Sequence, residues 1–205
     1  MFNIPHFGLF AFAVLMVNIT PGATFLAVSS AAVTKGVKSG ILTAAGAFCG
    51  LLVYAIASWA GLLKIITESV VLFNLVRYAG VAFLFYFAGK AFMQKAPEIP
   101  GIGEIKAVHD FRKGLTVNLL NPFSAILFLT LIPQFVQTNT KDLSSKILFL
   151  GLWISFSALT VNLGYALLFG LLRKYLMRYR LFWKWQGIIT GLLFLYLGIR
   201  IAFFK

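Results

Sequence analysis

Two short segments place asparagine close to a helix-breaking proline, inside long uncharged stretches. Residues 17–22 read VNITPG and residues 117–122 read VNLLNP. A proline within a membrane helix frees backbone carbonyl groups, and lipid tolerates such groups only where they line a cavity or meet a polar partner. Matching interruptions in the two halves of a membrane protein indicate the binding site of a transporter.

The composition places these segments in a membrane protein. Hydrophobic residues make up 60% of the chain and charged residues 11%, whereas a soluble domain carries about 25% charged residues. A helix needs roughly 20 apolar residues to cross a bilayer. The distances between charges supply six such spans, which we predict near residues 7–28, 38–64, 70–89, 114–136, 147–172 and 185–204.

The two halves of the chain resemble each other beyond the proline segments. Residues 81–90 (VAFLFYFAGK) align with residues 191–200 (GLLFLYLGIR). Because three spans per half is an odd number, the second half must insert upside down relative to the first. We therefore predict an all-α integral membrane protein with six transmembrane helices as two inverted three-helix repeats. One transmembrane domain covers residues 1–205, with repeat one at about 1–92, a cytoplasmic connecting loop at about 90–113 and repeat two at about 111–205.

The basic residues predict the orientation. Of the 18 Lys and Arg residues, twelve lie within 35–38, 90–113 and 173–184, and five lie on the opposite side. Positive residues stay cytoplasmic, so both termini are predicted outside. Basic residues at this surface also meet anionic headgroups. Membrane lipid is therefore an expected partner, and the net charge of +13 does not indicate nucleic acid.

Polar side chains within the predicted spans are candidate substrate contacts. Arg77 is the only charge predicted inside a span, where it costs at least about 2.5 kcal/mol, and its planar fork suits a carboxylate. It could instead snorkel to the headgroups. An asparagine amide suits a neutral or zwitterionic solute, although an interhelical hydrogen bond would also explain it. The asparagines in this set are Asn18, Asn118, Asn121 and Asn162.

Other kinds of chemistry find few candidates. No HExxH, nucleophile elbow or Gly-rich phosphate loop occurs, so we predict no enzyme activity, no metal site and no cofactor. One cysteine, Cys49, excludes a disulfide within the chain. Pairs of glycines at GxxxG spacing, Gly36–Gly40, Gly46–Gly50 and Gly187–Gly191, predict close helix packing. All five carboxylates are predicted in loops, where none is a membrane-embedded proton relay: Glu68, Glu98, Glu104, Asp110 and Asp142.

Residues 20–50 (TPGATFLAVSSAAVTKGVKSGILTAAGAFCG) and residues 111–136 (FRKGLTVNLLNPFSAILFLTLIPQFV) resemble the LysE/RhtB family of bacterial amino-acid exporters, and the resemblance extends over essentially the whole chain. It implies a multi-pass protein of the bacterial inner membrane that exports an amino acid or related small polar metabolite with the proton gradient. The family elements fall on Thr20-Pro21-Gly22, Gly36, Gly40, Asn121-Pro122 and Pro133-Gln134-Phe135. The chain departs from the family at Ala23, usually Pro, and at Phe123, usually Lys.

The expected mechanism joins the two proline segments. A solute carboxylate would meet Arg77 and the N-terminal end of a helix beginning near Pro21 or Pro122, and its ammonium would meet carbonyls freed before those prolines. Rocking of one repeat against the other would give alternating access. The candidate substrate-binding residues are Asn18, Thr20, Pro21, Gly22, Arg77, Asn118, Asn121, Pro122 and Asn162.

Two other functions remain open at this point. The protein could export a metal or another cation, which the lack of acids in the spans disfavours. It could also be a non-transporting structural or lipid-handling membrane protein. The sequence predicts neither the individual substrate nor the oligomeric state.

Overall fold

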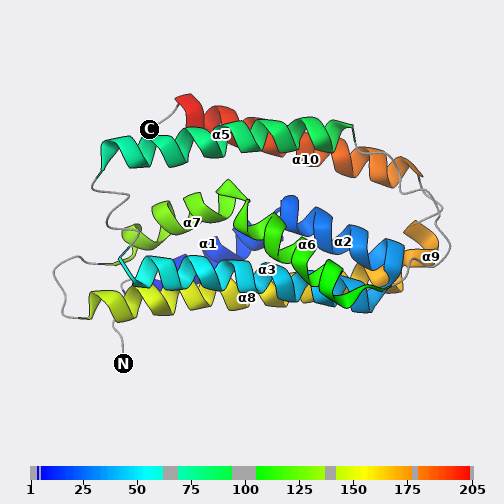
Figure 1. Ribbon diagram of the computed structural model, residues 1–205, viewed down its shortest axis with the longest axis horizontal. Helices are drawn as coiled ribbons and strands as arrows, with labels where there is room; N and C mark the ends of the chain where they lie inside the picture. Colours follow the sequence, from blue (N-terminus) through cyan, green and yellow to red (C-terminus); the bar gives the residue numbers. More distant parts are fainter. Residues whose placement is uncertain are drawn as a thin grey trace.

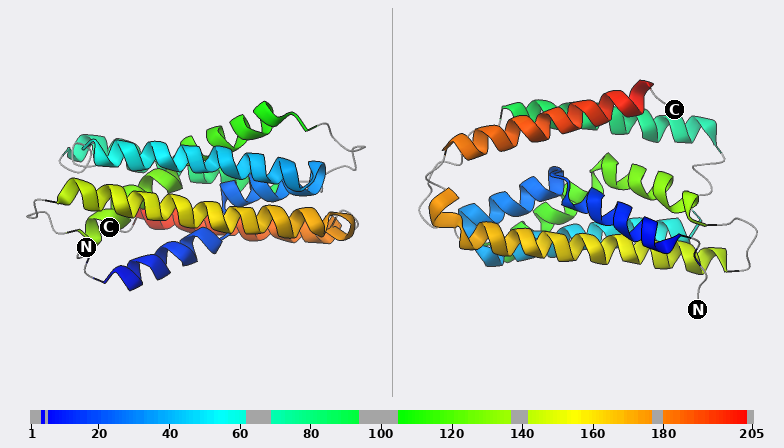
Figure 2. Two further views of the ribbon diagram at one scale, coloured as in Figure 1. Left: turned by 90° about the horizontal axis from the view of Figure 1, so that it is seen from below. Right: turned by 180° about the vertical axis from the view of Figure 1, so that it is seen from behind.

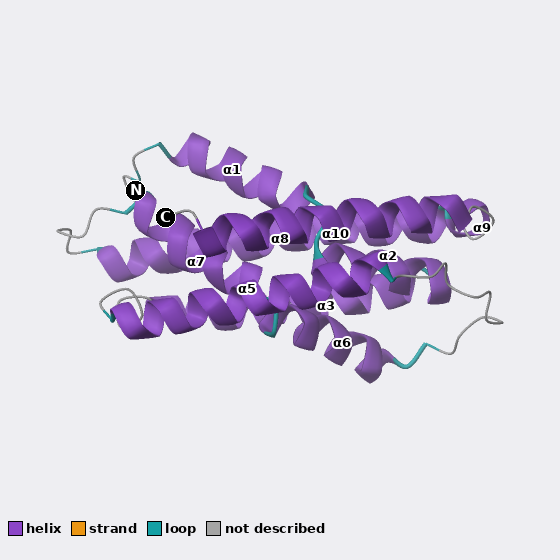
Figure 3. Cartoon of the chain, turned by 90° about the horizontal axis from the view of Figure 1, so that it is seen from above, coloured by secondary structure: helices purple, strands orange, loops and turns teal. Residues whose placement is uncertain are grey.

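The computed structural model describes residues 4, 6–61, 69–93, 105–136, 142–176 and 180–203. Within these ranges the chain is helical and contains no strand (Figure 3). The helices are α1 (Phe7–Ile19), α2 (Ala23–Lys35), α3 (Val37–Trp59), α5 (Val70–Phe92), α6 (Ala107–Leu119), α7 (Pro122–Gln134), α8 (Leu143–Leu171), the short α9 (Arg173–Leu176) and α10 (Arg180–Phe203).

The helices run back and forth along the long axis of the molecule (Figure 1). The pair α1 and α2 runs in the opposite direction to the pair α6 and α7, and α1 begins at the same end of the molecule at which α10 finishes. Helices α5 and α10 pack against each other and form a separate layer beside the rest (Figures 1 and 2).

Both predicted helix interruptions are confirmed. The chain bends by 52° between α1 and α2, and by 51° between α6 and α7. Pro21 lies outside both of its helices, and Pro122 is the first residue of α7. Proline fits the first position of a helix because the N–H that it lacks has no partner within the helix there. Each proline therefore stands at a break between two helices and not within one continuous helix.

In the part of the chain that the structure describes, two single helices, α3 and α8, are long and apolar enough to cross a membrane, and the count rises to four if each bent pair forms one span. Long runs without charged residues explain both helices. Helix α3 has no charged residue after Lys38, and α8 has none after Lys146. The outer faces carry large exposed hydrophobic side chains, such as Leu9, Leu75 and Phe203. Lipid, and not water, is the solvent that suits such a surface.

The predicted connecting loop is shorter than expected. Helix α5 continues to Phe92 and α6 already begins at Ala107, so a loop over the whole of 90–113 is wrong at both ends. Residues 94–104 lie outside the described part.

The prediction that every carboxylate lies in a loop is also wrong. Asp110 lies in the first turn of α6, with 1% of its side chain exposed, because Lys35 and Ser39 hydrogen-bond to its carboxylate. Asp142 immediately precedes α8, whereas Glu68, Glu98 and Glu104 lie outside the described residues.

Glycines bring α3 and α6 into very close contact. A Cβ atom on Gly46 would collide with the carbonyl oxygen of Phe111, and one on Gly114 with the carbonyl oxygen of Thr43. The packing expected of Gly40 also holds, since its Cβ would lie 2.9 Å from that of Ala166 on α8. Gly36 was wrongly predicted as a packing residue. It has a φ of 101° and forms the turn between α2 and α3.

The largest apolar core cluster lies at the other end of these helices. It joins α1, α3, α7 and α8 through Phe10, Leu51, Phe128 and Ile154. A smaller cluster of Ala23, Leu84, Ala88 and Phe194 connects the α5 and α10 layer to the start of α2. This smaller cluster lies beside the two helix breaks, since Phe123 near the start of α7 also packs against it.

Candidate functional site

A cavity of about 70 Å³ lies where the two helix breaks meet. Its lining comes from both breaks and from α1, α2, α3, α6, α7 and α8. Segments about 100 residues apart in the sequence therefore share one polar space. Six of the predicted site residues line it: Asn18, Thr20, Gly22, Asn118, Asn121 and Asn162.

The other three predicted site residues are not found in the described wall of the cavity. Pro21 lies in the first break but is not part of the cavity wall. Pro122 begins α7 and Arg77 belongs to α5, and the side chains of both are outside the described part. No described side chain of α5 lines the cavity.

The asparagines of the cavity differ in what their side chains already bind. Asn18 donates from Nδ2 to the hydroxyl of Ser157 on α8 at 3.1 Å. Asn121 caps α7, since its Oδ1 accepts from the backbone N–H of Phe123 at 3.1 Å. A side-chain cap of this kind satisfies one of the free N–H groups at a helix start. Asn121 therefore has a structural role in the second break as well as a place in the cavity wall.

Asn118 has a buried side-chain acceptor without a partner in the described structure. Only 3% of the residue is exposed, and its Oδ1 has no hydrogen-bond partner among the described residues. Its Nδ2 lies 3.5 Å from the hydroxyl of Thr24, which places the amide beside the first turn of α2. Gly50 makes room for it, because a Cβ there would lie 2.9 Å from the Cβ of Asn118. A buried acceptor without a partner costs about 1–3 kcal/mol, so a donor from a bound solute would remove this cost.

Two tyrosines that were not predicted from the sequence form hydrogen bonds at the helix breaks. The hydroxyl of Tyr165 on α8 donates to the carbonyl oxygen of Ile19, and that of Tyr54 on α3 donates to the carbonyl oxygen of Leu119, each at 2.7 Å. Both carbonyls belong to the last residue of a helix before a break. The signal in the sequence is the spacing of the two tyrosines, which is close to the repeat offset that aligns residues 81–90 with 191–200.

These bonds change the expected role of the freed carbonyls. The ammonium group of a solute was expected to bind there, but tyrosine hydroxyls already donate to Ile19 and Leu119. The hydroxyl of Thr20 donates to a third carbonyl, that of Met16, at 2.8 Å. In the described wall of the cavity, the buried side-chain acceptor Asn118 Oδ1 has no such donor.

The start of α2 offers donors to the same cavity. Gly22 precedes this helix, and no side chain caps its first turn. Gly22, Ala23, Thr24 and Phe25 all line the cavity. The N–H groups of an uncapped first turn and the positive end of the helix dipole favour a negatively charged group.

Apart from Ser124, the rest of the cavity wall is apolar. Val17, Leu51, Leu127 and Ala158 contribute aliphatic surface, and Phe123 adds an aromatic ring. No residue of this wall, as far as the structure describes it, carries a charged side chain. In the described ranges, no group of three or more His, Cys, Asp or Glu residues could hold a metal ion. The chain's two departures from the family pattern, Ala23 and Phe123, both face this site.

Comparisons with known proteins point to one family. The family model of the LysE type translocator matches residues 15–204. A leucine efflux protein of Enterobacter sp. (strain 638) is 26% identical over 206 residues, which cover 98% of this chain and 97% of the relative. A leucine efflux protein of Klebsiella pneumoniae is 28% identical over 143 residues, 68% of each chain. The membrane protein YrhP of Bacillus subtilis (strain 168) is 28% identical and covers 90% of this chain and 92% of its own length.

No solved structure matches the chain. The family match covers all but the first 14 residues and the last one, and it confirms the resemblance on which the amino-acid exporter was predicted. With its apolar helices, the chain is a multi-pass membrane transporter. It belongs to the LysE type translocator family.

Proposed function

We propose that the protein exports a neutral amino acid with an apolar side chain across the bacterial inner membrane. The observation that carries this proposal is the unpartnered Oδ1 of Asn118 beside the uncapped start of α2. An amino acid presents an ammonium donor and a carboxylate acceptor on the same carbon. Asn118 would receive the ammonium group, and the N–H groups of Ala23 and Thr24 would receive the carboxylate.

The apolar wall supports an uncharged side chain on the solute. A Lys or Arg side chain would enter a space without a carboxylate in its described lining, and a Glu side chain would enter one without a cation. An unpaired charge in such a place is strongly disfavoured. Two of the relatives are named leucine efflux proteins, so leucine is the first solute to test.

Alternating access between two inverted repeats is part of the proposal. The two bent pairs support it, because they have nearly equal angles and opposite directions along the molecule (Figure 1). The side that faces the cytoplasm would be the end where α2 finishes and α6 begins, since Lys35, Lys38, Lys106 and Arg173 gather there. Both termini would then face outward, and the proton gradient would supply the driving force.

Transport by purified protein in liposomes tests the proposal. Vesicles loaded with unlabelled leucine should take up external labelled leucine by counterflow, and an imposed proton gradient should drive net transport. In the same assay with lysine, glutamate or Zn²⁺ in place of leucine, the uptake of the labelled solute should not exceed the uptake by protein-free vesicles. Counterflow of lysine or Zn²⁺ without leucine would contradict the neutral substrate and favour a cation exporter. No counterflow with any amino acid, for protein shown to be folded, would support a non-transporting role.

A further inference from the structure

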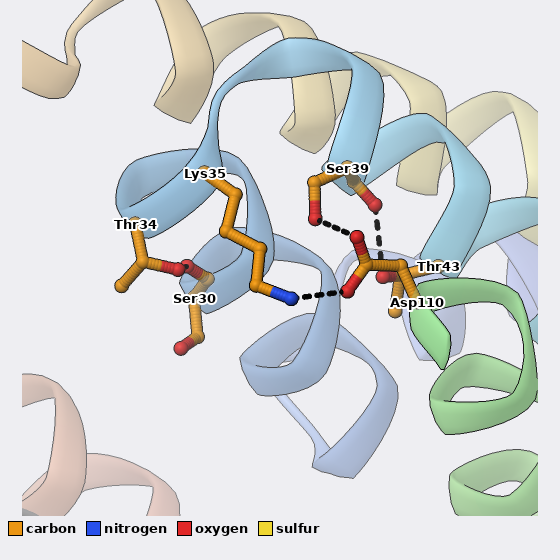
Figure 4. A network of polar contacts seen from close by, with 6 residues as sticks. All are labelled: Ser30, Thr34, Lys35, Ser39, Thr43 and Asp110. Atoms are coloured by element: carbon orange, nitrogen blue, oxygen red, sulfur yellow. Dashed lines mark hydrogen bonds and ion pairs between the residues drawn. The ribbon is translucent and has the colours of Figure 1, made fainter. Parts of the chain in front are cut away.

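A buried ion pair lies at the end of the molecule where α2 finishes and α6 begins. The Nζ of Lys35 lies 2.7 Å from Oδ1 of Asp110, and the hydroxyl of Ser39 donates to Oδ2 at 2.8 Å (Figure 4). Only 1% of the Asp110 side chain is exposed, against 26% of Lys35. Together these three residues, which we call the Asp110 cluster, join the last residue of α2, the first turn of α3 and the first turn of α6.

The Asp110 cluster closes a tightly packed half of the protein. Directly beside it, the glycine contacts of Gly46 with Phe111 and of Gly114 with Thr43 bring the backbones of α3 and α6 together. Thr43 is fully buried there. The α2 end has a further bond to α9, because Arg173 donates to the carbonyl oxygen of Thr34 at 2.8 Å.

In the opposite half, α1 is less buried than α2. Helix α2 buries eight of its 13 residues, whereas α1, of the same length, buries only Phe10 and Val14. The two members of one bent pair therefore differ in how firmly they are held. The cavity lies between these halves, so the described structure is closed at the end that carries the Asp110 cluster.

One stripe of α6 connects the cluster to the cavity. The buried residues of α6 are Asp110, Gly114 and Asn118. Residues spaced by four lie on one face of a helix, and eight residues span about 12 Å. Asp110, the closely packed Gly114 and the cavity residue Asn118 thus lie along one rigid face. A movement of α6 that separates Asp110 from Lys35 would also change the cavity wall.

We propose that the Asp110 cluster is the latch of a gate at this end of the cavity, and that this end opens when Lys35 and Ser39 separate from Asp110. Alternating access, on which the latch rests, is part of the proposed function. A carboxylate without its partners is costly to keep buried. The open state must therefore carry Asp110 into water, which requires α6 to move away from α2 and α3. Loss of the ion pair should shift the population toward the open state.

Cysteine labelling tests the latch without any substrate. On a Cys49→Ala background, Thr43→Cys places a thiol behind the closed gate, and N-ethylmaleimide crosses the membrane and reaches thiols from either side. Asp110→Asn and Lys35→Gln each remove one charge of the pair. We expect about tenfold faster labelling of the residue 43 thiol in each, as hydrogen bonds to charged groups are worth more than neutral ones. Lys38→Gln, which removes an exposed neighbouring charge, should leave the rate unchanged.

A second thiol separates gate opening from general loosening. Ser155→Cys on α8 is fully buried in the other half, where Ser155 bonds to the carbonyl oxygen of Gly151. Its labelling rate should stay constant in both charge variants. An unchanged rate at residue 43, or equal acceleration at residues 43 and 155, would overturn the latch. If Asp110→Asn does not insert, Lys35→Gln decides alone. Because no solute is involved, failure of leucine transport would not alter this result.

Discussion

The hydroxyl of Tyr165 donates a 2.7 Å hydrogen bond to the carbonyl oxygen of Ile19, the last residue of α1. Tyr54 makes the equivalent bond to Leu119, the last residue of α6. Tyr165 lies on α8, which follows the bent pair α6 and α7, but it bonds to the first bent pair. Tyr54 lies on α3, which follows the bent pair α1 and α2, but it bonds to the second. Each half of the chain therefore supplies the hydroxyl donor for the backbone carbonyl at the helix break of the other half.

Replacement of either tyrosine should make the protein less stable. Tyr165→Phe and Tyr54→Phe keep the ring but leave a carbonyl without its donor, so each should lower the free energy of unfolding by about 0.6–2 kcal/mol. Thermal unfolding in detergent measures this effect. Tyr175→Phe is the matched control, since Tyr175 is 69% exposed on α9. Equal melting temperatures for all three variants and the parent would show that the hydroxyls do not support the breaks.

Asn121 and Pro122 should differ in their effects on stability. Asn121→Ala removes the cap of α7 and should cost about 0.5–2 kcal/mol, with a loss of leucine export. Pro122→Ala should change stability little, because the first N–H of a helix has no partner within it. Chemical or thermal denaturation of both variants compares them directly. A clear gain in stability from Pro122→Ala would indicate that the proline strains a helix and does not simply begin one.

Asn118→Leu should separate stability from transport. Leucine has a similar shape but removes the unpartnered acceptor, so the protein should be as stable as the parent or more stable. Leucine counterflow should fall at least about tenfold, since a charge-assisted hydrogen bond to the ammonium group is lost. Thr116→Val, at an exposed position on the same helix, serves as the control. Normal counterflow in Asn118→Leu would remove Asn118 from the proposed site.

Arg77 stays a sequence-based prediction with a direct test. Arg77→Lys keeps the charge and loses the planar fork, so export should fall far more than membrane abundance does. Quantitative blotting and leucine counterflow on the same membranes measure both quantities. Full export by Arg77→Ala at equal abundance would identify Arg77 as a residue that only reaches the headgroups.

The orientation can be tested at the start of α6. Lys106 is exposed and precedes α6, so Lys106→Cys on the Cys49→Ala background offers a thiol on the proposed cytoplasmic side. An impermeant maleimide should label it only after the cells are opened. Labelling in intact cells would reverse the proposed orientation and place both termini in the cytoplasm.

The amino-acid sequence by itself determined the membrane class, the helical fold and the positions of both breaks. These properties are local: uncharged runs set the helices, and a proline, which lacks an N–H, favours a helix boundary at Pro21 and Pro122. The asparagines near the breaks could be chosen for the same reason, and Asn18, Asn118, Asn121 and Asn162 do meet at one cavity.

Only the tertiary structure decided how the polar groups are paired. Asp110 looked like a loop residue because its neighbours in the chain are charged, but Lys35 and Ser39, more than 70 residues away, bury and satisfy it. Tyr54 and Tyr165 likewise have no local signal, because their partners lie 65 and 146 residues away. The need of a buried polar group for a hydrogen bond is fixed by its chemistry, but which group meets that need depends on how the helices pack.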